Sequence, residues 1–157
     1  MHLIRTTTII LIFTCLPIKA WAIDVLNFES ITNSAIATNL NLYLQTTYKT
    51  KTSEYIIAQT DLNSDDINEY ILKRAYCQKE KMPSCNHIII AKTPHSFATI
   101  GNVRAHKIVI STTQTQNIRD ILAFNDELND YNFDIYMWSS DKNMYILKPN
   151  KTKVSVE

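Results

Sequence analysis

Four carboxylates and two side-chain amides fall within nine positions of the sequence, between two apolar runs. The carboxylates are Asp61, Asp65, Asp66 and Glu69 and the amides are Asn63 and Asn68, in the stretch DLNSDDINE. Calcium prefers oxygen ligands, and side chains at positions 1, 3, 5 and 9 of a compact loop can converge on one ion, together with a carbonyl at position 7. Here those ligands are Asp61, Asn63, Asp65 and Glu69, with the backbone carbonyl of Ile67. The spacing favours a calcium loop, and Ca²⁺ is the one cofactor that the sequence suggests.

The same stretch also has a simpler interpretation, a polar turn in which Asn and Asp bond their own backbone. The sixth position of calcium loops needs a left-handed backbone, usually at Gly. Asp66 stands there, and Asp is one of the few side chains that tolerate that conformation. The twelfth position is Leu72, so the bidentate Glu of a helix–loop–helix calcium site is absent. Both interpretations stay open.

The N-terminus has the order of a secretory signal. In MHLIRTTTIILIFTCLPIKAWA, Arg5 precedes an apolar run, and a small-x-small site follows at Ala20-Trp21-Ala22. The apolar run is too short to span a bilayer. We therefore predict cleavage after Ala22, a periplasmic or secreted protein, and no transmembrane segment after processing.

Two cysteines, Cys77 and Cys85, remain once residues 1–22 are removed. An even pair in an exported chain indicates a disulfide bond. The spacing is neither Cys-x-x-Cys nor a usual zinc pattern. Removal of residues 1–22 also leaves 14 basic residues against 15 acidic ones. This near-neutral balance has no electrostatic footprint for nucleic acid or for an anionic membrane.

The periodicity of the remaining chain predicts one helix followed by strands. Apolar residues recur at spacings of three and four within 29–48, which is typical of an amphipathic helix. The strand candidates are 53–60, 68–76, 86–92, 105–112, 117–124, 131–138 and 144–148. We predict an α+β fold in which one N-terminal helix packs on a mainly antiparallel β-sheet of about seven short strands. The predicted organisation is a signal peptide at 1–22, a single domain at 23–148 and a polar tail at 149–157.

The acidic loop resembles the calcium loops of FG-GAP and VCBS-like β repeats, which read D-x-[DN]-x-D-G-x-x-D. Asp61, Asn63 and Asp65 match that pattern, while Asp66 replaces the Gly and Glu69 the last Asp. More broadly, the chain is similar to small exported bacterial proteins of uncharacterised function that carry a DLNGDG-type loop, a Cys pair and a late Trp…Tyr hairpin. That resemblance implies an exported domain and does not imply any enzymatic reaction.

Aromatic side chains in the last two strand candidates are the other group that suggests binding. Tyr131, Tyr136, Trp138 and Tyr145 are candidates for a partner surface, because Tyr and Trp anchor interfaces. No nucleophile elbow, phosphate-binding Gly loop or zinc-protease motif is present, so we assign no catalytic residue. We expect a non-enzymatic binding domain, such as an inhibitor or immunity-type protein with a protein partner. The alternatives are a carboxylate-dependent hydrolase, using Asp65 and Glu69 with His106, and a calcium-stabilised structural module.

Overall fold

The computed structural model describes residues 24–31, 34–79, 82–125 and 132–148. The predicted signal peptide and the predicted tail at 149–157 lie outside the described residues. The strands are β1 (Asp24–Val25), β2 (Glu29–Ser30), β3 (Tyr55–Thr60), β4 (Glu69–Arg74), β5 (Cys85–Lys92), β6 (Phe97–Ala105), β7 (Lys107–Thr115), β8 (Ile118–Phe124), β9 (Phe133–Ser139) and β10 (Met144–Leu147). The helices are α1 (Ser34–Tyr48), the short 3-10 turn η1 (Thr52–Glu54) and α2 (Ala75–Lys79).

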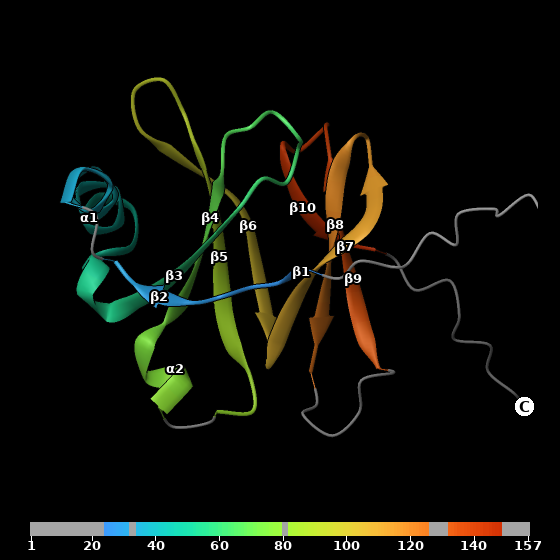
Figure 1. Cartoon of the computed structure of the whole chain (residues 1–157), viewed down its shortest axis with the longest axis horizontal. Coiled ribbons are helices and arrows are strands. Elements are labelled where there is room, and N and C mark those ends of the chain that lie inside the picture. The colour runs from blue at the N-terminus through green and yellow to red at the C-terminus, as the bar shows by residue number, and fades with distance from the viewer. Residues whose placement is uncertain (1–23, 32–33, 80–81, 126–131, 149–157) are drawn as a thin grey trace, which may run out of the picture.

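These strands form two five-stranded antiparallel sheets. Sheet A has the order β1-β7-β8-β9-β10, and sheet B has the order β2-β3-β4-β5-β6. Helix α1 covers one face of sheet B, and sheet A lies against the other, so the molecule has three layers (Figure 1). The prediction of one helix on a single sheet of about seven strands is therefore wrong, and the described chain is mostly β.

The middle strands of sheet B explain why the chain forms two sheets and not one. In β4, Tyr70 and Leu72 pack on the side of α1, whereas Ile71 packs on the side of sheet A. In β5, Ile88 and Ile89 divide in the same way. A sheet that is covered on both faces needs near-continuous apolar runs, as in YIIA, YIL and HIII. Those runs mark a central layer, which an analysis of one strand at a time does not reveal.

Helix α1 is held on sheet B by its apolar stripe. Leu40 and Leu44 are fully buried and pack against Tyr55, Leu72 and other residues of the outer face of sheet B, the face toward α1. The helix begins at Ser34, later than the expected residue 29, because Glu29–Ser30 form β2 and pair with Ile57 and Ile56 of β3. Among the described residues, no helix has the length and apolar character needed to cross a membrane.

Two short connections join the sheets. The N-terminal segment pairs first with β7 of sheet A through β1 and then with β3 of sheet B through β2. Strands β6 and β7 are separated by one residue, His106, whose backbone N–H donates to the carbonyl of Phe124 at 2.8 Å. Strand β6 is thus the edge of sheet B from which the chain passes directly into sheet A.

Candidate binding site

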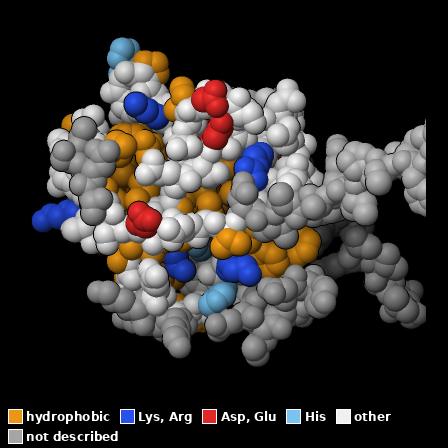
Figure 2. All heavy atoms as spheres, in the orientation of Figure 1, with side chains coloured by type: hydrophobic (Ala, Val, Ile, Leu, Met, Phe, Trp, Pro, Cys, Tyr) orange, Lys and Arg blue, Asp and Glu red, His pale blue; other side chains and the backbone are white. Residues whose placement is uncertain are grey.

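The acidic loop between β3 and β4 is organised around one carboxylate. Oδ1 of Asp61 accepts backbone N–H groups from Asn63 at 3.2 Å, Ser64 at 2.7 Å and Asp65 at 3.3 Å, and Oδ2 accepts that of Asp66 at 3.0 Å. Burial would raise the pKa of Asp61, but these donors outweigh it and hold the pKa below its usual range. Figure 2 shows acidic side chains at the top of the face seen there, over this connection.

The rest of the loop is also tied to its own backbone. Asp66 has a φ of 64° and Ser64 a φ of 61°, so the sixth position adopts the expected left-handed conformation. Asp65 Oδ1 accepts the N–H of Ile67 at 2.8 Å, and Asp65 Oδ2 accepts the side-chain amide of Asn63 at 2.9 Å. These contacts are those of a polar turn whose side chains bond its own backbone.

Glu69, the last candidate ligand, is buried at the start of β4. Its Oε2 accepts the backbone N–H of Leu62 at 2.8 Å. Burial raises the pKa of Glu69, and the charges of Asp65 and Asp61 raise it further. Among the described residues, no three His, Cys, Asp or Glu side chains gather as a group that could hold a metal ion. Calcium binding therefore stays a prediction for this loop.

The aromatic residues of the last hairpin pack mainly toward the core. Tyr145 is only 3% exposed, and its hydroxyl donates to the carbonyl of Arg119 at 2.8 Å. Trp138 packs edge-on against Tyr145, with ring centroids 5.7 Å apart, and Tyr136 also lies half-buried against the core between the sheets. Tyr131 lies outside the described residues. The structure thus uses Tyr145 for packing and leaves Tyr136 and Trp138 partly buried, and a partner surface on these aromatic residues stays a prediction.

The carboxylates and the histidine of the hydrolase alternative are not brought together. Glu69 begins β4, at the end of sheet B where Tyr70 pairs with Ile90. His106 follows β6 at the opposite end, where Ala105 pairs with Cys85, and its Nδ1 lies 3.3 Å from the carbonyl of Met82.

The two cysteines lie next to helix α2. Cys77 and Cys85 stand at disulfide distance, with their Cα atoms 6.2 Å apart, as the predicted bond requires. Both are buried. The pair connects α2 to the start of β5, so it holds one wall of the pocket described next.

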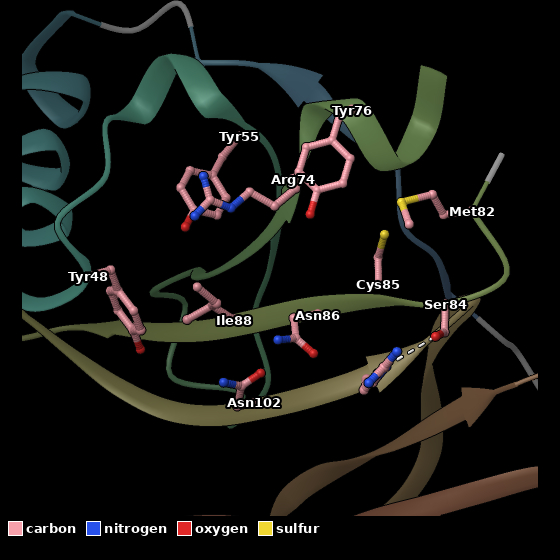
Figure 3. A pocket seen from close by; sticks show the side chains of 11 residues that line it. Tyr48, Tyr55, Arg74, Tyr76, Met82, Ser84, Cys85, Asn86, Ile88 and Asn102 are labelled. Atoms are coloured by element: carbon pink, nitrogen blue, oxygen red, sulfur yellow. Dashed lines mark hydrogen bonds between the residues drawn. The ribbon is translucent and has the colours of Figure 1, made fainter. Parts of the chain in front are cut away.

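An open pocket of about 410 Å³ lies on the outer face of sheet B, beyond the end of α1 (Figure 3). The volume is in the range of small-molecule sites. Its lining combines aromatic, amide and guanidinium side chains, and we call it the tyrosine–arginine pocket. The residues that define it here are Tyr48, Arg74, Tyr76, Asn86, Asn102 and Arg104.

The pairing of the strands places the floor residues. Asn86 of β5 pairs with Arg104 of β6, and Ile88 pairs with Asn102. All four point to the same face as the residues under α1, but the helix ends at Tyr48 and leaves this end of the sheet uncovered. The asparagines and Arg104 lie on the part of the outer face that α1 does not cover, where side chains are not packed under the helix.

The walls come from other elements and are held by their own contacts. The guanidinium of Arg74 lies 4.5 Å from the ring centroid of Tyr55 and forms an ion pair with Glu54. The hydroxyl of Tyr48 shares a hydrogen bond of 2.6 Å with Thr99. Burial raises the pKa of Tyr48, against the smaller opposing effect of that hydrogen bond, so the phenol is neutral at physiological pH. The wall from α2 is Tyr76, whose side chain is 49% exposed.

Sequence analysis did not identify this pocket. The sequence does carry one sign of it. On β5 and β6, the outward positions 86 and 102 are polar, although the runs around them are apolar. The change is visible only when the register of β5 on β6 is known.

Comparison with known protein families, with curated proteins and with solved structures finds no match for this chain. Function must therefore be argued from the site itself.

Proposed function

We propose that this protein is a non-enzymatic domain, exported to the periplasm or beyond, that binds a protein partner through the tyrosine–arginine pocket. The observation that carries the proposal is the convergence of two arginines, two asparagines and three tyrosines in one concave site. Tyr and Arg are the residues that most often supply the binding energy of an interface, and they do so from pockets.

The chemistry of the lining favours binding over catalysis. Among the described residues the lining has no carboxylate and no histidine, so none of its side chains is an ordinary general base for its one serine, Ser84. That hydroxyl accepts the Nε–H of Arg104 at 3.1 Å. The lining instead presents N–H donors beside aromatic faces, which is what recognition of a partner group requires.

Site-specific photo-crosslinking tests the proposal. A benzophenone amino acid at Tyr76, on the exposed rim, should form a covalent adduct with the partner in producing cells, detected by mass spectrometry. The same probe at Thr112, an exposed position on β7 of the other sheet, is the matched control. Adducts that form equally from both positions, or from neither, would contradict binding at the pocket.

A calcium-stabilised structural module is the second candidate. The observation that favours it is the loop backbone, because Asp66 already has the left-handed conformation that such loops need at this position. The hydrolase alternative has no comparable support, because Glu69 and His106 lie at opposite ends of sheet B.

A further inference from the structure

The balance of charge in the tyrosine–arginine pocket selects one class of ligand. Its lining holds two arginines and no acidic residue. Arg74 is already paired with Glu54, which stands outside the lining. Within the part of the chain that the structure describes, Arg104 meets the hydroxyl of Ser84 and no carboxylate. Among the described residues, one positive charge without a carboxylate partner, that of Arg104, therefore faces the pocket.

Two side-chain amides lie next to that charge. Asn86 stands directly across from Arg104 in the ladder between β5 and β6, and Asn102 lies two positions before it on the same face of β6. Neither amide has a hydrogen-bond partner among the described residues, and each offers two N–H donors. Figure 3 shows both asparagines on the floor of the pocket, between Tyr48 on one side and Ser84, the hydrogen-bond partner of Arg104, on the other.

An apolar surface adjoins these donors. Ile88 lies in the floor beside Asn102, its partner in the ladder, and is almost fully buried. Tyr48, Tyr76 and Met82 border the same space, and the last two are partly exposed at the rim. A ligand that fills the pocket therefore meets a cation and amide donors at one end and aromatic or aliphatic surface at the other.

We propose that the pocket binds one carboxylate attached to an aromatic or branched apolar group, with Arg104 as its charged partner and Asn86 and Asn102 as neighbouring donors. This inference rests on the proposed binding function and names the ligand chemistry of the same site. A guanidinium fork matches a carboxylate in shape. A single positive charge without a carboxylate partner among the described residues matches the one negative charge of a carboxylate, whereas a phosphate group carries nearly two.

Two sources in a protein partner share this chemistry: the C-terminal residue of the chain and an acidic side chain beside an apolar one. Three probes separate them. The first is acetyl-Leu-Phe with a free C-terminal carboxylate, the second is the same dipeptide with a C-terminal amide, and the third is acetyl-Glu-Phe amide. The first two differ only in charge, and the third moves the carboxylate to a side chain.

Titration of the whole exported chain with each probe, followed by NMR, measures affinity and location. At least one carboxylate probe should bind ten or more times more tightly than the Leu-Phe amide, with shifts at Asn102 and Arg104, and whichever of the two binds more tightly identifies the source. Arg104→Gln should remove that tenfold preference. Lys142→Gln, which removes one positive charge from the exposed β9–β10 turn, should keep it.

Three outcomes would overturn the assignment: equal binding of the free acid and its amide, no binding of either carboxylate probe at 100 times the concentration of protein, or competition by inorganic phosphate as strong as by the free acid. If one of these outcomes is found and the probe at Tyr76 still crosslinks to the partner, the ligand assignment fails and the proposed binding function stands. Loss of that crosslink overturns the function itself, so the two failures are distinguishable.

Discussion

Gly101 of β6 lies directly beneath Tyr145 of β10. A Cβ atom built on this glycine would stand 3.2 Å from Cβ and 3.3 Å from Cδ2 of Tyr145, and 2.8 Å from Cδ1 of Ile89. The chain has one glycine, and it stands where β6 of sheet B meets a buried tyrosine of β10 in sheet A. Its absent side chain makes room for the tyrosine ring.

Replacement of this glycine should therefore destabilise the protein by overpacking. We expect Gly101→Ala to lower the free energy of unfolding by about 1–3 kcal/mol, measured by urea denaturation. Ile89→Val removes the nearest atom, Cδ1. In a double-mutant cycle, the pair Gly101→Ala and Ile89→Val should cost less than the sum of the single changes. Additive costs would show that the contact with Ile89 is not the source of strain.

His87 makes the stability of the protein depend on pH. The imidazole is 1% exposed, and burial, assisted by the positive charge of Lys73, lowers its pKa from 6.5 to about 4. Between these values the unfolded chain binds a proton that the folded chain excludes, so stability rises with pH across this window. Acidification from pH 6.5 to 4 should remove about 3 kcal/mol of stability.

Urea denaturation between pH 4 and pH 7.5 measures this effect, and His87→Gln should abolish that part of the slope. Glu69 contributes with the opposite sign, because its raised pKa favours the folded state as the pH falls. Glu69→Gln should therefore make the loss on acidification steeper. A wild-type slope that His87→Gln leaves unchanged would contradict the assignment.

Substitutions in the acidic loop can distinguish a structural role of the loop from a calcium-binding role. Asp61→Ala should lower the melting temperature in EDTA, because the carboxylate accepts four backbone N–H groups whether or not an ion binds, and only that of Asp65 has another acceptor, Oδ1 of Asn63. If calcium binds, the ion should add about 2.7 kcal/mol at 100 times its dissociation constant. Asp65→Ala should then abolish the calcium-dependent shift, and Asp66→Gly should increase it. Equal melting temperatures in calcium and in EDTA would leave the loop as a turn.

The cysteine pair should contribute modestly to stability and strongly to the pocket. The ring from Cys77 to Cys85 has nine residues, so chain entropy predicts a loss of about 2.6 kcal/mol on reduction. Because α2 carries Tyr76, reduction should also weaken the crosslink from that position. Thiol titration of the native protein should find neither Cys77 nor Cys85 free; two reactive thiols per molecule would contradict the bond.

The predicted processing is tested by mass. Protein recovered from the periplasm or medium should begin at Ile23, because the small-x-small site ends at Ala22. An intact mass that includes residues 1–22 in a cytosolic fraction would show that the N-terminus is not a cleaved signal.

Features encoded within a few residues could be predicted, and features that depend on distant strands could not. The left-handed backbone at Asp66 and the pairing of Cys77 with Cys85 follow from local chemistry and from counting. The second sheet could not be predicted in this way, because the side chains that pack against Ile71 and Ile89 in the core come from β6 to β10. The pocket also escaped prediction, since Asn86 and Arg104 become neighbours only through the register of β5 on β6.

The way strand β1 is paired has a consequence for the order of folding. From β3 to β6 the strands of sheet B follow one another in sequence with short connections, so most of that sheet can grow by pairing neighbouring segments. Sheet A is completed only when Asp24 and Val25 reach Ile110 and Val109, across most of the described chain. Closing so long a loop is slow, and a two-residue strand has few contacts to offset it. In native-state hydrogen exchange, the amides of this edge should therefore open first, while the amides of β4 and β5 exchange last.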